Sequence, residues 1–313
     1  MTDKIATREA YGKALARLAA TDERIVVLDA DLSKSTKTAD FAAVAPERFF
    51  NCGIAEQNML GVAAGLAASG KVPFASTFAV FATGRAFEQI RNSIAYPGLN
   101  VKIAATHAGI TVGEDGGSHQ SIEDIALMRV LPGMTVVVPA DGPEAEQAVY
   151  ALAKHNGPAY LRLGRLATPV VNSEDYKFEL GKGVLLRKGT DIIIFACGGM
   201  VSVALEAAQL LATESIFAAV ANIHTIKPLD ADFILEYASH CGAAFTVEEH
   251  NVLGGLGSAV AEVLSEHCPV PLFRLGINDS FGQSGSPQAL LEKYGLTATA
   301  VASRVKGVLH KKK

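Results

Sequence analysis

Glu56 is the residue of this sequence from which a chemical role can first be argued. It stands near the start of a predicted helix in residues 51–70, NCGIAEQNMLGVAAGLAASG, for which Gly70 is a natural stop. Small residues dominate this helix, so it fills a core poorly but lets another backbone approach closely. A carboxylate in this place either faces solvent and does little, or is buried and holds a proton that it can give or take.

A glycine-rich loop provides the next candidates. Residues 113–120 read GEDGGSHQ and contain Asp115 and His119. Glycines let a backbone turn sharply and come close to a ligand. A single histidine is more often structural, but one in such a loop, after a predicted strand, is a candidate for ligand binding.

Asp31 directly follows a predicted strand, in the sequence LDADLSKS. The carboxyl ends of parallel strands are where α/β proteins collect their binding residues, so Asp31 is a further candidate. The alternative is that Asp29 or Asp31 only caps the turn that follows.

The elements that must position these residues alternate between strand and helix. This alternation predicts an α/β fold, in which a mostly parallel sheet is covered by helices on both faces. β-Branched runs predict strands at residues 24–31, 72–77, 101–107, 134–140 and 159–163. Apolar periodicity predicts helices at residues 6–20, in the Glu56 segment, and at 86–95, 122–130 and 144–155.

A polar stretch at residues 168–183, TPVVNSEDYKFELGKG, interrupts this pattern with Pro169 and Gly181. A second and smaller α/β series follows it. We therefore expect two domains, residues 1–175 and 181–313. The second series predicts strands at residues 191–198, 216–222, 243–249 and 271–277, and helices at 202–212, 230–240, 257–267, 287–294 and 297–309.

Composition excludes several classes of protein. With 49% apolar and 19% charged residues over 313 positions, the chain is globular and long enough for two domains. A net charge of -4 gives no reason to expect binding to nucleic acid or to an anionic membrane. There is no secretion signal and no apolar run of about 18 residues. The four cysteines lack metal-ligand spacing, which indicates reduced thiols and a cytoplasmic protein.

Five motifs in order carry a resemblance to the transketolase family of thiamine diphosphate enzymes. They are GIAEQNM, AAGLA, PFASTFAVF, THAGITVGEDGGSHQ and MRVLPGMTVVVPAD, and all resemble the pyrimidine-binding domain of that family. The remainder, from about Gly181 to Lys313, resembles the family's C-terminal domain. The resemblance covers essentially the whole chain and implies these two α/β domains.

One family motif is missing. Full-length transketolases begin with a diphosphate-binding domain, whose GDG motif and a downstream asparagine hold magnesium and the cofactor's phosphates. This chain has no GDG, and its nearest string, at residues 113–116, belongs to a different motif. The resemblance therefore implies the second subunit of a split transketolase. An N-terminal partner subunit would hold Mg²⁺ or Ca²⁺ in an α2β2 assembly, and we assign no metal ligand to this chain.

The resemblance also implies how the cofactor is held. Glu56 matches the glutamate that binds N1' of the pyrimidine ring and activates the cofactor, in apolar surroundings. Phe78 and Phe81 match the stacking pair, although spacing alone would favour simple core packing. Asp31 matches an aspartate near the ring system. Where some members carry a tyrosine this chain has Gly84, so the partner or Arg85 would build that wall.

The substrate residues follow from the same resemblance. Asp115 matches a residue that selects the donor's stereochemistry, and His119 matches a catalytic residue that binds the hydroxyl of the two-carbon unit. Four further positions match phosphate contacts of the family: Arg8, Ser35, His107 and Arg165. Together they imply transfer of a two-carbon ketol unit between sugar phosphates, with pentose-phosphate intermediates as the default.

Two alternatives stay open at this point. The chain could be the β subunit of a 2-oxo acid dehydrogenase or a deoxyxylulose-phosphate-synthase-like enzyme, or a non-catalytic assembly or regulatory subunit that kept the fold. In the second domain, GGLGS at residues 254–258 resembles an anion-binding turn before a helix. We assign no catalytic residue to that domain and interpret Cys52 as a packing residue.

Overall fold

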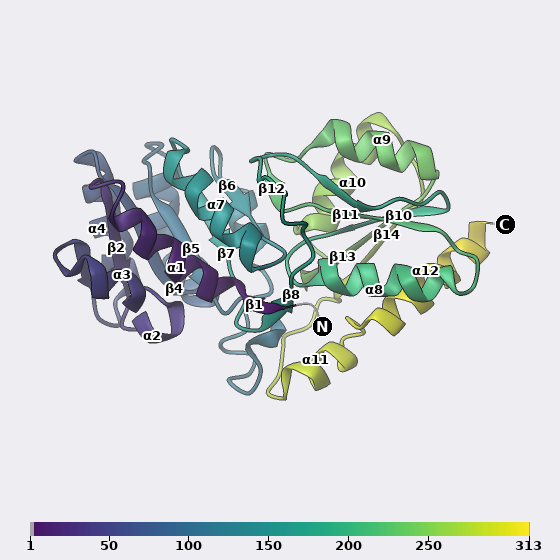
Figure 1. Cartoon of the computed structure of the whole chain (residues 1–313), viewed down its shortest axis with the longest axis horizontal. Helices are drawn as coiled ribbons and strands as arrows, with labels where there is room; N and C mark the ends of the chain where they lie inside the picture. The colour runs from purple at the N-terminus through teal and green to yellow at the C-terminus, as the bar shows by residue number, and fades with distance from the viewer. Residues whose placement is uncertain (1–2, 313) are drawn as a thin grey trace.

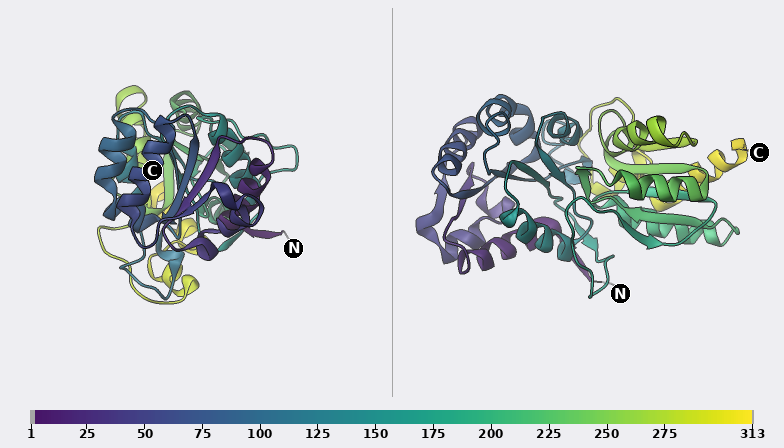
Figure 2. Two further views of the ribbon diagram at one scale, coloured as in Figure 1. Left: turned by 90° about the vertical axis from the view of Figure 1, so that its left-hand side faces the viewer. Right: turned by 90° about the horizontal axis from the view of Figure 1, so that it is seen from above.

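The computed structural model describes residues 3–312 and places them in two α/β units that lie side by side along the longest axis of the molecule (Figure 1). The view from above shows the same arrangement (Figure 2). Each unit has its own mostly parallel sheet between helices, so the predicted fold class is confirmed. No helix within residues 3–312 has the length and apolar character needed to cross a bilayer.

The first sheet contains seven strands. They are β2 (Ile25–Asp29), β3 (Phe49–Asn51), β4 (Val72–Phe78), β5 (Lys102–Thr106), β6 (Thr135–Val137), β7 (Ala159–Arg162) and β12 (Thr225–Lys227). Their order is β12-β6-β7-β5-β4-β2-β3. The six strands from β6 to β3 run parallel, so their carboxyl ends meet at one edge of the sheet. β12 is antiparallel to β6 and comes from the second half of the chain.

Helices cover both faces of this sheet because each one carries an apolar stripe. One face holds α1 (Thr7–Ala19), α3 (Ala39–Val44) and α7 (Gly142–Lys154), and the other holds α4 (Glu56–Ala68), α5 (Phe87–Gln89) and α6 (Asp124–Arg129). On the first face, Tyr11 and Leu15 of α1 are buried with Phe74 of β4. On the second, Met59 and Leu60 of α4 are fully buried. The predicted Glu56 helix therefore lies directly on the sheet.

The second sheet has the strand order β14-β13-β10-β11-β9. Its strands are β9 (Val184–Arg187), β10 (Ile192–Ala196), β11 (Ala218–Asn222), β13 (Ala244–Asn251) and β14 (Leu272–Ile277). One face packs on α8 (Met200–Ala212), α11 (Pro287–Lys293) and α12 (Ala298–Lys312), and the other on α9 (Ala231–Cys241) and α10 (Leu256–His267). One apolar cluster extends from α4 through β6 to α10, so the two units share a continuous core.

The segment between the units is fastened to the first unit. β8 (Ala167–Pro169) pairs antiparallel with β1 (Lys4–Ala6). Asp141 caps the start of α7 and also accepts hydrogen bonds from the backbone N–H groups of Val171 and Asn172, at 2.9 and 3.0 Å. The polar stretch at which the sequence predicts a domain boundary therefore lies along α7.

The structure differs from the sequence prediction at residues 86–95, where one regular helix is expected. Two π-helical turns, Phe81–Arg85 and Ile90–Ala95, flank the short α5. A π-helical turn contains one more residue than an α-helical turn, so a period of 3.6 does not place its side chains. The sequence analysis also misses α2 (Ser33–Thr36) and α3, and the strands β1, β3, β8, β9 and β12, which are only three or four residues long.

Candidate active site

The predicted site residues gather at the carboxyl edge of the first sheet. Asp31 follows β2, Glu56 follows β3, Phe78 ends β4, His107 follows β5 and Arg165 follows β7. Because these strands are parallel neighbours, their carboxyl ends lie next to one another. Such an edge is where α/β folds place their ligands.

Glu56 is the first residue of α4, and its side chain is only 2% exposed. Its Oε2 accepts a hydrogen bond of 2.8 Å from Nη1 of Arg85, whose side chain is 47% exposed. The Arg85 guanidinium also lies over the ring of Phe81, 4.5 Å from its centroid. The sequence analysis expects apolar surroundings for Glu56, and the structure corrects this: a half-exposed guanidinium compensates the charge of the buried carboxylate.

Arg85 is the last residue of a π-helical turn. The turn spans Phe81–Arg85, and residues four or five apart lie above one another in a π-helix. Gly84 has open space around it: apart from its chain neighbours, residues 3–312 place no atom within 4 Å of where a Cβ would stand. Arg85 is the chain neighbour of Gly84, and the group that builds the wall at this position stays a prediction.

Phe78 and Phe81 form a flat apolar bed. Their rings are nearly parallel, at 13°, with centroids 5.9 Å apart. His107 stacks on Phe78 at 3.9 Å, and its backbone is in the left-handed region, with φ at 57°. His119 meets Phe81 edge-on at 5.3 Å. The aromatic pair thus joins two of the predicted substrate residues, which sequence spacing alone does not reveal.

Arg8, His107 and Arg165 of the predicted phosphate site lie close enough to affect one another's pKa values. Burial lowers the pKa of His107 to about 3, and the charges of Arg8 and Arg165 add to this shift. Burial also lowers the pKa of Arg8, with a further contribution from Arg165. The Nε of Arg8 is buried and has no hydrogen-bond partner among residues 3–312. An anion placed here would satisfy that donor and relieve the repulsion.

The partners of this basic group are mostly backbone oxygens. Nη1 of Arg8 donates to the carbonyl oxygen of Ser35 at 2.8 Å, so Ser35 contacts Arg8 through its backbone. Nη1 of Arg165 donates to the carbonyl oxygen of Val112 and lies 3.9 Å from the carboxylate of Asp115. The structure therefore connects Arg165 to the glycine-rich loop that carries Asp115 and His119.

The two aspartates after β2 have different surroundings. Asp29 is fully buried and accepts hydrogen bonds from Thr36 Oγ1 at 2.6 Å and Thr38 Oγ1 at 2.8 Å, and burial raises its pKa. Asp29 therefore stabilises the turn after β2 through the hydroxyl groups of Thr36 and Thr38. Asp31 is exposed, with φ at 63°, and its Oδ1 accepts a hydrogen bond of 3.1 Å from Asn51. Asp31 is thus available at the sheet edge.

These groups fit the pyrimidine ring that the resemblance implies. The parallel rings of Phe78 and Phe81 offer a stacking surface. Arg85 lies over the ring of Phe81 and pairs with the carboxylate of Glu56, so it connects that carboxylate to the ring pair. Oε1 of Glu56 receives no hydrogen bond from the part of the chain that the structure describes. A ring nitrogen could bind there.

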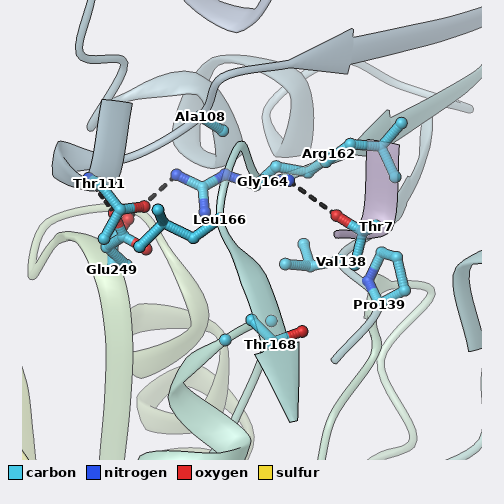
Figure 3. Close-up of a pocket in the computed structure, with 13 residues that line it drawn as sticks. Thr7, Ala108, Thr111, Val138, Pro139, Arg162, Gly164, Leu166, Thr168 and Glu249 are labelled. Atoms are coloured by element: carbon cyan, nitrogen blue, oxygen red, sulfur yellow. Dashed lines mark hydrogen bonds between the residues drawn. The ribbon is translucent and has the colours of Figure 1, made fainter. Parts of the chain in front are cut away.

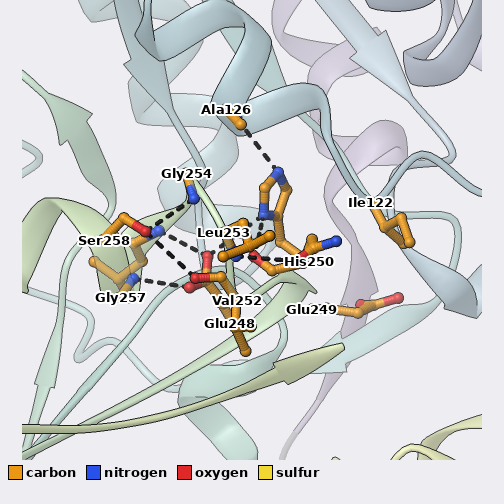
Figure 4. Close-up of polar contacts among 12 residues, drawn as sticks. Ile122, Ala126, Glu248, Glu249, His250, Val252, Leu253, Gly254, Gly257 and Ser258 are labelled. Carbon is orange, nitrogen blue, oxygen red and sulfur yellow. Dashed lines mark hydrogen bonds and ion pairs between the residues drawn. The ribbon is translucent and has the colours of Figure 1, made fainter. Parts of the chain in front are cut away.

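The carboxyl edge of the second sheet is different. The backbone N–H groups of Leu256 and Gly257, at the start of α10, donate to the carboxylate of Glu248 at 2.7 and 2.8 Å. The GGLGS turn that resembles an anion site therefore already binds a carboxylate of its own chain. Figure 4 shows this cluster, in which Nε2 of the buried His250 accepts a hydrogen bond of 3.3 Å from Ala126 N–H of the first unit.

The two units meet at this second edge. Arg162 donates to the carbonyl oxygen of Glu249 at 3.0 Å, and the carboxylate of Glu249 accepts the N–H of Thr111 at 2.7 Å (Figure 3). Only a cavity of about 40 Å³ is left between these residues. No group of three or more His, Cys, Asp or Glu side chains suited to a metal ion occurs within residues 3–312.

Two protein-family models match this chain, one in each of its two α/β units. Residues 3–170 match the family model described as "Transketolase, pyrimidine binding domain", and residues 181–301 match "Transketolase, C-terminal domain". A putative transketolase C-terminal section of Methanocaldococcus jannaschii is 50% identical over 301 residues, which are 95% of this chain and 94% of that protein.

Two further relatives cover nearly the whole chain. A 6-deoxy-6-sulfo-D-fructose transketolase subunit, SqwH, of a Clostridium species is 46% identical over 305 residues, 97% of this chain and 95% of that protein. A solved structure described as "Split gene transketolase, inactive beta4 tetramer" is 60% identical, with a TM-score of 0.92, and covers 99% of this chain and 100% of its own.

Proposed function

Since this chain belongs to the transketolase family, we propose that it is the catalytic half of a two-subunit enzyme that transfers a two-carbon ketol unit between sugar phosphates with thiamine diphosphate. One observation carries the proposal. The buried Glu56, the ring pair Phe78 and Phe81 and a basic group with a buried arginine donor that has no partner among residues 3–312 share one edge of the first sheet.

When bound, thiamine diphosphate supplies a carbon nucleophile that attacks the carbonyl group of a sugar. In our proposal, Glu56 holds a proton at N1' of its pyrimidine ring through Oε1, while Arg85 keeps Oε2 in place. Phe78 and Phe81 bind the flat face of the ring and exclude water from it. Asp31 borders the ring system from the end of β2.

The substrate would lie between the aromatic bed and the basic group. Arg8, His107 and Arg165 are proposed to bind the phosphate, with Ser35 at the same place. Charge-assisted hydrogen bonds to a phosphate are stronger than neutral ones, and two arginines suit that geometry. Asp115 and His119 would then contact the hydroxyl groups nearer to the carbon that is transferred, and His119 orients the reacting fragment.

We propose that an N-terminal transketolase subunit binds the diphosphate and Mg²⁺ or Ca²⁺, in an α2β2 heterotetramer with two equivalent sites. Two findings support this: the chain has no GDG motif, and a 60% identical relative is described as an inactive beta4 tetramer. The isolated chain would accordingly be inactive. The four cysteines, interpreted as reduced thiols, lead us to expect a cytoplasmic enzyme.

Pentose-phosphate intermediates are the first substrates to test. Phosphorylated sugars and their sulfonated counterparts present similar anionic ends, and one relative is named for a sulfonated fructose. The basic group of this chain would bind either anion.

The decisive experiment purifies the chain with and without the product of its neighbouring gene. Each sample is assayed for ketol transfer from phosphorylated ketoses in the presence of thiamine diphosphate and Mg²⁺. We expect activity only in the mixture. Ketol transfer by the chain without its partner, or an inactive mixture that has formed a stable complex and binds cofactor, would refute the proposal.

A further inference from the structure

A segment of the second unit holds the glycine-rich loop of the first. We call residues 113–120 the substrate loop and residues 278–286, which connect β14 to α11, the strap. The two lie side by side at the bottom of the molecule in Figure 1, next to α11. The sequence analysis gives the second domain no part in the chemistry, so this contact calls for an explanation.

Gln120 makes the central contact. Its side chain is buried, and its Nε2 lies within hydrogen-bond distance of three carbonyl oxygens: Ile110 at 3.1 Å, Gly113 at 3.2 Å and Gln283 at 2.9 Å. Ile110 belongs to the turn that leads into the substrate loop, Gly113 is the first residue of the loop, and Gln283 belongs to the strap. One amide group therefore ties both ends of the loop to the second unit.

A second hydrogen bond lies further along the loop. Oγ of Ser284, in the strap, donates to the carbonyl oxygen of Glu114 at 2.7 Å. Glu114 is the direct neighbour of Asp115 in the sequence. The strap therefore contacts the substrate loop next to Asp115, through Glu114, and next to His119, through Gln120.

Glycines allow the two backbones to come this close. A Cβ on Gly117 would lie 2.8 Å from the carbonyl oxygen of Gly282, and a Cβ on Gly282 would collide with the carboxamide of Gln120. On Gly113, a Cβ would lie 3.3 Å from the ring of Pro287, the first residue of α11. The GEDGG sequence is therefore needed for packing against the second unit, in addition to any approach to a ligand.

The strap is itself anchored to α11 and the turn after it. Tyr294 donates from its hydroxyl group to the carbonyl oxygen of Phe281 at 2.9 Å, and Nζ of Lys293 donates to Oε1 of Gln283. Leu290 of α11 is 1% exposed and belongs to the core of the second unit. The strap is therefore attached to a packed helix and is suited to position another segment.

We propose that the strap positions the substrate loop and that Gln120 is the positioning residue through which it sets the location of His119. This inference rests on the proposed function, because it assigns the second domain a part in orienting the donor sugar. His119 directly precedes Gln120 in the substrate loop. Its N–H donates to the carbonyl oxygen of Gly116 at 3.0 Å, and its ring meets the ring of Phe81 edge-on.

The test uses the complete enzyme, made of this chain with its partner subunit. Gln120→Leu keeps the bulk of the side chain and removes its hydrogen bonds. We expect turnover to fall about tenfold, because small displacements of a positioned group are costly, while KM for the donor changes less than about twofold. Hydrogen exchange at C2 of the bound cofactor, which needs no donor, should stay within about twofold of wild type.

A double-variant experiment separates positioning from general loss of structure. In a His119→Ala background, Gln120→Leu should reduce turnover by less than about twofold further, because it acts through His119. Gly282→Ala should resemble Gln120→Leu, and should have little added effect in a Gln120→Ala background, where the collision is absent. Gly307→Ala, in open space on α12, is the matched control and should change nothing.

A further measurement is independent of activity. Amide hydrogen exchange in the isolated chain should be faster within residues 113–120 in Gln120→Leu and Ser284→Ala than in wild type, but unchanged in Gly307→Ala. Unchanged exchange in the loop, or a full additional loss of turnover in the His119→Ala background, would overturn the inference. If the wild-type complex lacked ketol transfer, the proposed function would fail, whereas loop exchange would still decide the role of the strap.

Discussion

The carboxyl edges of the two sheets differ in how their buried polar groups are paired: the first leaves one buried arginine donor without a partner among residues 3–312, and the second pairs its buried glutamates with backbone N–H groups. At the first edge, burial and the charges of Arg8 and Arg165 lower the pKa of His107, and Nε of Arg8 is buried without a partner among residues 3–312. At the second edge, Glu248 and Glu249 accept hydrogen bonds from backbone N–H groups. A buried donor without a partner at a sheet edge is a group that an anionic ligand would satisfy.

Burial makes the second edge costly to disturb. Burial raises the pKa of both Glu248 and Glu249, although hydrogen bonds and Arg162 act in the opposite direction. Arg162 forms a two-point ion pair with Asp124: its Nε donates to Oδ2 at 2.7 Å and its Nη2 donates to Oδ1 at 3.1 Å. The four predictions that follow test this contrast, from the largest expected effect to the smallest.

Asp124→Ala should give the largest effect, on stability. It leaves the guanidinium of Arg162 buried without its counter-charge, which costs about 3–5 kcal/mol in the free energy of unfolding. Urea unfolding of the isolated chain would measure this. The double variant Asp124→Leu with Arg162→Met, in which no charge is left, should recover most of the loss. If Asp124→Ala lowered the free energy of unfolding by less than about 1 kcal/mol, this ion pair would not be what stabilises the second edge.

Glu56→Gln should affect catalysis at the first edge and leave the fold intact. Ketol transfer by the complete enzyme should fall about 100-fold or more, because an amide cannot hold the proton at N1'. Cofactor binding should be largely retained. Hydrogen–deuterium exchange at the cofactor's C2 measures the step directly, and an exchange rate equal to that of wild type would contradict the role of Glu56.

Arg165→Ala should have an intermediate effect, on substrate choice. The loss of a charge-assisted hydrogen bond is worth about 1.5–3 kcal/mol and should appear mainly as a raised KM for a phosphorylated donor. The preference of the enzyme for that donor over its unphosphorylated analogue should narrow. Arg24→Ala, just before β2 at the opposite edge of the sheet, is the matched control. An unchanged preference in Arg165→Ala would exclude Arg165 from phosphate recognition.

His107→Asn should give the smallest effect, on the pH dependence of stability. The pKa of His107 is about 3 in the folded chain against an ordinary value of 6.5, so between these values the unfolded chain binds a proton that the folded chain does not. Wild-type stability should therefore fall as the pH decreases below 6.5, by about 1 kcal/mol at pH 5.5 relative to the variant. Asparagine tolerates the left-handed backbone at this position.

Urea unfolding at several pH values would measure the His107 effect, with His240→Asn, on the exposed surface of α9, as the control. Parallel pH profiles for wild type and His107→Asn would mean that burial and the nearby arginines do not lower the pKa of His107 in the folded chain. In that case the contrast between the two edges would lose its electrostatic basis.

Much of this arrangement could be predicted from the sequence. Long β-branched runs and regular apolar periods locate the main strands and helices, because those patterns arise from local burial. Glu56 at the start of its helix and Asp31 after β2 follow from the same logic, whereas His107 after β5 and Arg165 after β7 were identified only from the family resemblance. The roles assigned to them came from the family resemblance, and they stay predictions.

The contacts that sequence analysis missed depend on long-range geometry. Arg85, at the end of a π-helical turn, pairs with Glu56 across 29 positions of sequence, and no periodicity signals this contact. Gln120 meets Gln283 across 163 positions of sequence. The GGLGS turn looks like a ligand site until the fold brings Glu248 to it, and the sequence gives no sign that this partner is internal.

The position of β12 has a consequence for synthesis on the ribosome. Thr225–Lys227 provide the outermost strand of the first sheet, beside β6, although the other six strands of that sheet are complete by Arg162. During translation, β6 therefore stays an uncovered sheet edge until residues beyond 227 have emerged. Exposed edges favour pairing with other chains, so a nascent or truncated first domain would depend on chaperones or stay aggregation-prone until this strand arrives.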